Sequence, residues 1–222
     1  MESVVKGRRY DRSGRQARTR LTRAAVVDAA RALFLERGYA ATTIEAISEA
    51  SATPPATVYR LFSSKLGVLT ALLDVAAGGD DEAIAMGDRP HVRALLADPD
   101  PACQLRGFAR LTREVMARLA PVQQILLSAA GSDSAAAALL AEHTRQRQVG
   151  QGRIAHALAH RAALRPGLDE PAAADVLHAL LSPEVYRLLV TDRHWDPDRY
   201  ERWLADTLIH QLLRPTADQH TT

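Results

Sequence analysis

The sequence TTIEAISEASATPPATVYRLFSSK, residues 42–65, decides the fold of this chain. Its pattern predicts two short helices, over residues 43–50 and 54–61, joined by a tight turn. The second helix would carry three polar side chains outward, namely Thr57, Tyr59 and Arg60. Two short helices of this kind are typical of a helix-turn-helix, whose second helix enters the major groove of DNA.

Capping and apolar residues place the ends of these two helices. Thr42 and Glu45 have the spacing of a capping box at the start of the first helix. Thr53 is the expected N-cap of the second, because Pro54 suits a first helical position, where the missing N–H costs nothing. The residues expected to face the core are Val58 and Phe62, which lie four apart.

A third helix is predicted to precede them over residues 22–37, with Thr22 as its N-cap and Gly38 ending it. One face of this helix is apolar at helical spacing: Val26, Ala30, Leu33 and Phe34. Residues 1–18 are polar and rich in arginine, and we interpret them as a flexible basic arm. Such an arm either follows the phosphates or the minor groove of DNA, or is only a solvated tail.

The net charge of the 222 residues is only +2, but it is unevenly distributed. Residues 1–65 contain twelve basic and six acidic side chains, a net charge of +6, which leaves −4 for residues 66–222. A basic N-terminal third on a mildly acidic body indicates a polyanionic partner that is bound at one end of the molecule.

Several other classes of protein are disfavoured by the composition. The single cysteine, Cys103, excludes an intramolecular disulfide and a cysteine-rich zinc site. No apolar run reaches the roughly 18 residues of a membrane span, and the basic N-terminus lacks the apolar stretch of a signal peptide, so a cytoplasmic protein is expected. His156 and His160 lie four apart, with His143 upstream, but no acidic residue completes a metalloprotease pattern. No metal, cofactor or catalytic site is predicted.

The rest of the chain is also predicted to be helical, so the fold class is all-α with about nine helices. The expected helices cover residues 65–77, 102–119, 121–131, 134–161, 171–190 and 197–213. Ser63 or Ser64 would cap the first of these and Ser134 the fourth, and a short turn is expected at residues 91–97. Pro183 should kink the helix that contains it. The last two helices, the eighth and ninth, have more apolar surface than one internal partner needs, which favours a symmetric dimer through them.

The run from Thr22 to Leu73 resembles the DNA-binding domain of the TetR family of transcriptional regulators. Three motifs carry the resemblance at the family's spacing: Leu-Phe-x-x-x-Gly-Tyr at 33–39, Thr-Thr-Ile at 42–44 and Thr-Val-Tyr-Arg-x-Phe-x-x-Lys at 57–65. Ala52 departs from the glycine that is frequent in the turn, which implies modest strain there. Pro54, Pro55 and Ala56 replace a frequent Ser-Pro-Gly, so the operator cannot be taken from a relative.

The resemblance implies three regions: a basic flexible arm over residues 1–18, a helix-turn-helix domain over 19–66, and an effector-binding and dimerisation domain over 67–222. The DNA-binding residues that it implies are Thr43, Glu45, Pro55, Ala56, Thr57, Tyr59, Arg60 and Lys65. Of these, Arg60 would take a guanine, and Lys65 would bind a phosphate. Other readings stay open: Tyr59 as a packing residue, Glu45 as a capping residue and Lys65 as a solvated helix start.

By the same resemblance, the chain is expected to be a homodimeric, ligand-responsive repressor that binds a near-palindromic operator in double-stranded DNA. A small-molecule effector would lie among the helices of the body. The candidate ligand-binding residues are Phe108, Thr112, Met116, Gln124, Leu127, His143, Arg147 and Tyr186, and each is alternatively a plain core residue. Two other functions remain open: a regulator of the same fold without an effector or controlled by a partner protein, and, more remotely, an all-α enzyme.

Overall fold

The computed structural model describes residues 4–80 and 84–215, and within these ranges the chain forms helices and no strand. The helices are α1 (Val4–Ala41), α2 (Ile44–Ala50), α3 (Pro55–Phe62), α4 (Lys65–Gly78), η1 (Met86–Asp88), α5 (Pro90–Ala97), α6 (Pro101–Ala130), α7 (Ser134–His160), α8 (Glu170–Leu180), α9 (Pro183–Tyr186), η2 (Arg187–Asp192) and α10 (Pro197–Leu212). The predicted all-α class is therefore confirmed. No single helix in these ranges is both long and apolar enough to cross a membrane.

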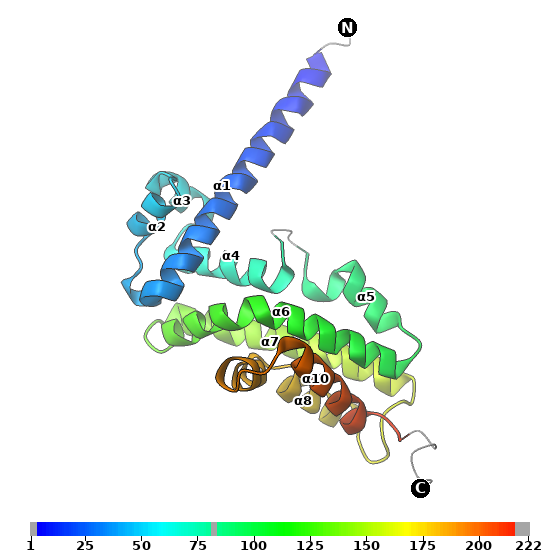
Figure 1. Ribbon diagram of the computed structural model, residues 1–222. Coiled ribbons are helices and arrows are strands. Elements are labelled where there is room, and N and C mark those ends of the chain that lie inside the picture. The colour runs from blue at the N-terminus through cyan, green and yellow to red at the C-terminus, as the bar shows by residue number, and fades with distance from the viewer. Residues whose placement is uncertain (1–3, 81–83, 216–222) are drawn as a thin grey trace.

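The molecule has a small head and a larger body (Figure 1). The head consists of α2, α3 and the C-terminal half of α1, while the N-terminal half of α1 projects away from everything else. In the body, α4 and α5 cover one side of the long pair α6 and α7, and α8 and α10 cover the other. Because α1 and α4 both pack against α6, the head is attached directly to this long helix of the body.

Helix α1 is longer than predicted, since it begins at Val4 rather than at Thr22. The described part of the arm is therefore helical, and residues 1–3 lie outside the described ranges. Thr22 is not an N-cap: its hydroxyl donates to the carbonyl of Arg18, 3.0 Å away, inside the helix. The segment contains no proline, and arginine is a good helix former, so the helix continues through Gly7 and Gly14. The predicted break at Gly38 is present, with a φ of 79°.

The N-cap of α2 is Thr43, one residue after the predicted Thr42. The Thr43 hydroxyl accepts a hydrogen bond from the N–H of Ala46 at 3.1 Å. Thr42 is buried instead, and its hydroxyl donates to the carbonyl of Gly38 at 2.8 Å. The predicted Thr42–Glu45 capping box is thus wrong, because Thr42 closes the end of α1 rather than the start of α2.

The turn between α2 and α3 is held by two hydrogen bonds between Ser48 and Thr53. The Thr53 N–H donates to the Ser48 carbonyl at 3.0 Å, and the Ser48 hydroxyl donates to the Thr53 carbonyl at 2.6 Å. Thr53 is therefore not the N-cap of α3: that position belongs to Pro54, which has no side-chain hydrogen bond to give. Ala52 takes a positive φ of 48°, as expected for a residue in a position that favours glycine.

The body departs from prediction at its prolines. Pro121 lies inside the continuous helix α6 instead of starting a new one. Pro121 and Ala117, whose carbonyl loses its helical partner, both lie on an exposed side, so water can satisfy that carbonyl. Pro183 does the opposite: it begins a new helix, α9, after the Ser182 hydroxyl accepts from the N–H of Val185. The expected kinked helix over residues 171–190 is thus broken into α8, α9 and the π-helix η2.

Other capping predictions are mixed. Ser64 caps α4 as one of the two predicted alternatives, with its hydroxyl accepting from the N–H of Gly67 at 3.0 Å. Asp133, not Ser134, caps α7, and its carboxylate accepts from the N–H of Ala135 at 2.9 Å. Both helices, α4 and α7, start where predicted, and only the residue that caps α7 differs from the prediction.

One hydrophobic core runs through head and body. Val26 and Phe34 of α1 meet Ile47, Val58 and Phe62 of the helix-turn-helix, all of them buried. The fully buried leucines of the body continue the same cluster: Leu69, Leu73, Leu105, Leu126, Leu158, Leu177, Leu204, Leu208 and Leu212. The head and the body are therefore joined by direct packing.

Candidate DNA-binding surface and ligand cavity

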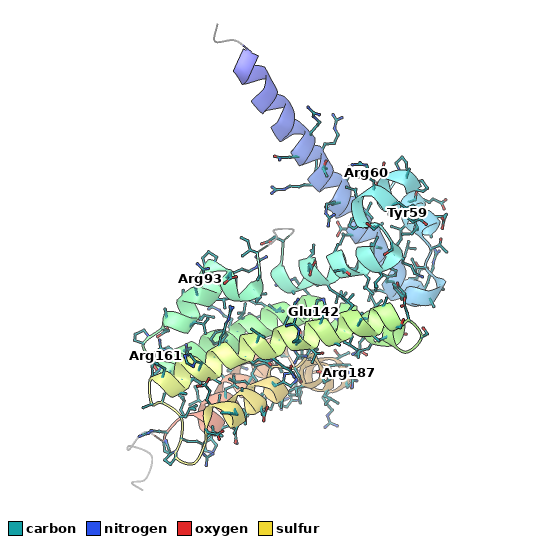
Figure 2. The ribbon with its side chains drawn as sticks, turned by 180° about the vertical axis from the view of Figure 1, so that it is seen from behind. Tyr59, Arg60, Arg93, Glu142, Arg161 and Arg187 are labelled. Atoms are coloured by element: carbon teal, nitrogen blue, oxygen red, sulfur yellow. The ribbon has the colours of Figure 1, made fainter. Side chains whose placement is uncertain are left out.

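One side of α3 is buried in the core, and the opposite side carries exposed polar side chains. Val58 and Phe62 are buried, so they fix which side of this short helix faces outward. On the opposite side, Arg60 is exposed and Tyr59 is 48 % exposed, which excludes a purely packing role for Tyr59. Figure 2 shows both side chains on the outer surface of the head. Pro55 and Ala56, in the first turn, are exposed as well, and Thr57 is half-buried.

The start of α2 supplies a second exposed group of this surface. Thr43 is exposed, and its hydroxyl already accepts from Ala46, so that hydroxyl keeps its proton for a further acceptor such as a phosphate oxygen. Glu45 is also exposed in the first turn of α2, and the capping bond is made by Thr43. The sequence-based alternative of Glu45 as the capping partner therefore has no counterpart in the structure.

Lys65 does not reach outward as the sequence suggested. Its ammonium donates to the carbonyls of Tyr39 at 2.7 Å, Thr42 at 2.8 Å and Ala40 at 3.4 Å. It also lies 4.3 Å from the centre of the Tyr39 ring, and burial lowers its pKa. All three N–H donors are directed at the end of α1, where free carbonyls favour a cation. Lys65 thus ties α4 to α1, and a role in binding phosphate is not supported by this geometry.

Arg23 is a structural link between α1 and α3 that the sequence did not reveal. Its guanidinium donates to the carbonyl of Leu61 at 3.0 Å and lies 4.5 Å from the centre of the Phe62 ring. The contact joins residues 38 positions apart, so no local pattern indicates it. Arg23 also lines the cavity described next, so one side chain contacts both α3 and the interior of the body.

A cavity of about 970 Å³ lies between α1, α4 and α5 on one side and α6 and α7 on the other. Five of the predicted ligand-binding residues line it: Phe108, Thr112, Met116, His143 and Arg147. Three do not. Gln124 is exposed on the outside of α6, and its buried neighbour Gln123 lines the cavity in its place. Leu127 lines a smaller adjoining cavity of about 470 Å³. Tyr186 is buried against Tyr200, with ring centres 5.1 Å apart.

The cavity is mostly apolar but contains charged groups at defined places. Burial lowers the pKa of His143 and raises the pKa of Asp74, and the two side chains influence each other electrostatically. Arg23 also acts on Asp74, in the direction that lowers its pKa. Asp80 and Arg89, in the segment between α4 and α5, form a bidentate ion pair with N–O distances of 2.7 and 2.8 Å. His143, Asp74 and Arg23, which come from α7, α4 and α1, all line this one cavity.

His156 and His160, the histidine pair that lies four residues apart, have a carboxylate and each other as neighbours. His156 Nδ1 lies 3.2 Å from the Glu170 carboxylate, and the rings of His156 and His160 are 6.1 Å apart. Within residues 4–80 and 84–215, no group of three or more possible metal ligands is found.

Comparison with known proteins finds a sequence match over the head and structural matches over most of the chain. Residues 26–72 match the family model described as bacterial regulatory proteins, tetR family. This match includes the C-terminal half of α1, the whole of α2 and α3 and most of α4. No curated protein sequence matches the chain.

Solved structures of regulators superpose over nearly the whole chain. The fatty acid degradation regulator FadR from Bacillus halodurans has a TM-score of 0.69 at 19 % identity, covering 90 % of this chain and 97 % of its own. SmeT of Stenotrophomonas maltophilia, bound to triclosan, has a TM-score of 0.65 at 21 % identity, covering 90 % and 94 %. NalD, the secondary repressor of the MexAB-OprM multidrug efflux pump in Pseudomonas aeruginosa, has a TM-score of 0.60 at 22 % identity, covering 88 % and 98 %. At these identities the likeness establishes a shared fold.

Proposed function

We propose, from the premise that this chain has the DNA-binding domain and the all-helical fold of the TetR family, that it is a ligand-responsive transcriptional repressor. Two copies would place their α3 helices in successive major grooves of a near-palindromic operator. A small molecule in the large cavity would change the affinity for that operator. The observation that carries the proposal is the exposed polar face of α3, held outward by Val58 and Phe62.

The DNA contacts follow from the exposure of each side chain. Arg60 is placed to donate to a guanine or to a phosphate, while Pro55 and Ala56 at the tip of α3 suit contact with a thymine methyl. Thr43 offers its hydroxyl to a phosphate at the start of α2. The projecting N-terminal half of α1 adds sequence-independent attraction, because residues 4–20 include seven lysines and arginines.

The dimer is proposed to form through α8 to α10, which correspond to the eighth and ninth helices of the sequence analysis. Part of their apolar surface is already used inside the chain, since Leu177, Leu204 and Leu208 are fully buried. The remainder supports an interface: Leu188 is 49 % exposed, and several residues are half-buried, among them Val176, Leu180, Leu189, Trp203 and Leu213. A symmetric partner would cover these side chains.

Regulation is proposed to run through Arg23. A molecule in the cavity that changes the position of Asp74 or Arg23 also changes the hydrogen bond from Arg23 to Leu61 and therefore the position of α3. Such a ligand shifts the protein between two states only if it binds one of them more tightly. The cavity volume lies near the upper end of the roughly 300–1,000 Å³ that is usual for small-molecule sites.

The proposal is tested by DNA binding and by its reversal. The purified protein is first used to select its operator from random duplexes, and a footprint is then recorded on the selected DNA. We expect two protected half-sites about 10 base pairs apart, or a multiple of one helical turn. A screen of small molecules for release of this DNA should yield at least one that acts at a cavity residue such as Phe108.

Two results of that screen separate the proposal from its rival. Release of the operator by a compound whose effect is lost in a cavity variant supports a ligand-responsive repressor. Intact operator binding that no small molecule changes would favour a regulator of the same fold that has no effector or is controlled by a partner protein. The proposal assigns no chemical step to the chain.

A further inference from the structure

Arg147 is a half-buried cation in α7, and two of its donor atoms lack partners. Its side chain lines the large cavity and also the smaller one next to it. The Nε and Nη2 atoms are both buried, and within residues 4–80 and 84–215 neither has a hydrogen-bond acceptor. Glu184 is close enough to raise the pKa of Arg147, although burial has the larger effect and lowers it. Arg147 and Glu184 nevertheless do not form an ion pair within the described residues.

Three other arginines that line the cavity have acceptors for their guanidinium groups, and a fourth, Arg153, lies 3.9 Å from the Asp88 carboxylate. Arg23 donates to the carbonyl of Leu61 at 3.0 Å, and Arg89 donates to Asp80 at 2.7 Å. Arg145 pairs with Glu142 at 2.7 Å, two positions before Arg147 in the same helix. Burying a charged donor without an acceptor costs stability, so such a group calls for an explanation, and a ligand that supplies the acceptor is one. Arg147 is thus placed as the anion-binding group of the cavity.

The walls around Arg147 define the rest of the ligand. Gln123, which is buried, lies on the walls of both cavities beside Arg147 and offers an amide to the same group. The α6 wall is apolar except for Thr112 and Gln123, and its apolar residues are Phe108, Leu111, Val115, Met116 and Leu119. Asp28 and Asp74 lie on the opposite wall, formed by α1 and α4, where they would repel a ligand with several negative charges. The cavity therefore favours one negative charge on an apolar body.

We infer that the effector is an amphipathic monocarboxylate, whose carboxylate binds Arg147 and whose aliphatic or otherwise apolar body lies along α6. The Nε and Nη2 donors lie on one edge of the planar guanidinium, and this edge matches the two oxygens of a carboxylate. This inference rests on the proposed function, because it names the chemical class of ligand that occupies the regulatory cavity.

A series of three probes with the same ten-carbon tail tests the charge of the ligand. Decanoate, 1-decanol and decyltrimethylammonium are titrated into the full-length protein, below their aggregation limits, and binding is measured by calorimetry. We expect decanoate to bind at least about tenfold more tightly than the alcohol, because a charge-assisted bidentate pair replaces an unsatisfied guanidinium. The ammonium should bind more weakly than either.

Two matched variants locate the effect. Arg147→Met keeps the apolar stem, and should remove the preference for decanoate over decanol. It should also raise the melting temperature of the ligand-free protein, since it removes two buried charged donors without an acceptor. Arg110→Met on α6, which removes an exposed arginine that lines neither cavity, should keep the wild-type preference. A purely structural arginine would give a lower melting temperature in Arg147→Met and an unchanged preference.

The inference is overturned if decanoate does not bind, if the alcohol or the ammonium binds as tightly, or if the preference survives in Arg147→Met. Operator release is measured in parallel, which keeps this result separate from the proposed function. If neutral or cationic compounds release the operator through the cavity, the proposed function stands and the ligand class is wrong. If decanoate binds through Arg147 without changing operator affinity, the ligand class stands and the proposed regulation is wrong.

Discussion

Lys65 is part of a sequence motif that suggests DNA binding, but its contacts in the structure are structural. It lies at the end of the Thr-Val-Tyr-Arg-x-Phe-x-x-Lys run, next to α3, the proposed DNA-reading helix, where a lysine suggests phosphate binding. In the structure its ammonium is bound by the carbonyls of Tyr39, Ala40 and Thr42. These carbonyls belong to the end of α1 and the residue after it, so Lys65 fixes the orientation of the head on α4.

Lys65→Met should therefore lower stability more than it changes DNA recognition. Removing the ammonium leaves part-buried carbonyls without a donor, at a cost of about 1–3 kcal/mol. Thermal unfolding should show the loss, while the dependence of operator affinity on salt concentration should keep its slope. A slope reduced by about one with an unchanged melting temperature would instead identify Lys65 as a phosphate contact.

His143 is predicted to make stability depend on pH. Burial holds its folded pKa below the ordinary value of 6.5, against the opposing charges of Asp74 and Glu142. The unfolded state then binds more protons below that pH, so this residue's contribution to stability is lost as the pH falls from about 6.5. His143→Gln should make the melting temperature less sensitive to pH in this range. His160→Gln, an exposed change on the same helix, is the control, and an equal effect of both variants would contradict the account.

At the scale of the elements, the turn between α2 and α3 combines strain with strong local hydrogen bonding. Ala52 has a φ of 48°, a region that costs a residue with a Cβ about 1–2 kcal/mol. The pair of hydrogen bonds between Ser48 and Thr53 holds the turn in place despite this cost.

Ala52→Gly should accordingly raise the melting temperature by relieving this strain, with a gain of up to about 1 kcal/mol after the extra backbone entropy of glycine is subtracted. Ala50→Gly, in the last turn of α2, should lower it by a similar amount, because glycine is a poor helix former. If both changes lower stability equally, the turn is not strained at Ala52.

Arg23 couples α1, α3 and the cavity, and its removal should weaken that coupling. In Arg23→Met the bond to Leu61 and the contact over Phe62 are lost, while the apolar stem remains. We expect lower operator affinity and a smaller change of affinity on adding an effector, by up to the roughly 1–3 kcal/mol that is typical of allosteric coupling. Fluorescence anisotropy with and without effector measures both quantities.

Arg31→Met is the matched control, since Arg31 is an exposed arginine two turns further along α1. It should leave the effector response intact. An unchanged response in Arg23→Met, or an equal loss in Arg31→Met, would show that the signal takes another route through the core.

At the scale of the whole molecule, local sequence patterns predict where the helices lie in the chain, but they do not predict which helices pack against each other. The apolar spacing of Val58 and Phe62 and the glycine at position 38 are local, and the structure agrees with them. The effect of a proline depends on its surroundings, which is why Pro121 is tolerated in a helix and Pro183 starts a new one.

The residues that line the cavity are also predicted only in part from local sequence signals. The expected residues on α6 and α7 that line it follow from helical periodicity, but Gln124 points away where its neighbour Gln123 points inward. A rotation of one residue about a helix axis is set by packing against other helices, which composition does not reveal. The contact between Arg23 and Leu61 is a stronger case, because the two residues are far apart in the sequence.

In the head-to-body arrangement of Figure 1, α3 lies on the outside of the head. Every part of the proposed function requires that the exposed face of α3 meets DNA, whatever ligand the cavity holds. Arg60 is the most direct probe of that face, and Arg93, an exposed arginine on α5 in the body, is a control of the same chemistry (Figure 2).

The decisive measurement is operator affinity of Arg60→Ala and Arg93→Ala by fluorescence anisotropy at one fixed salt concentration. The account predicts that Arg60→Ala weakens binding by about 1–3 kcal/mol and relaxes the sequence preference within each half-site, while Arg93→Ala binds like the wild type. Equal affinity and unchanged preference in Arg60→Ala, with the fold intact by circular dichroism, would contradict the assignment of α3 as the helix that reads DNA.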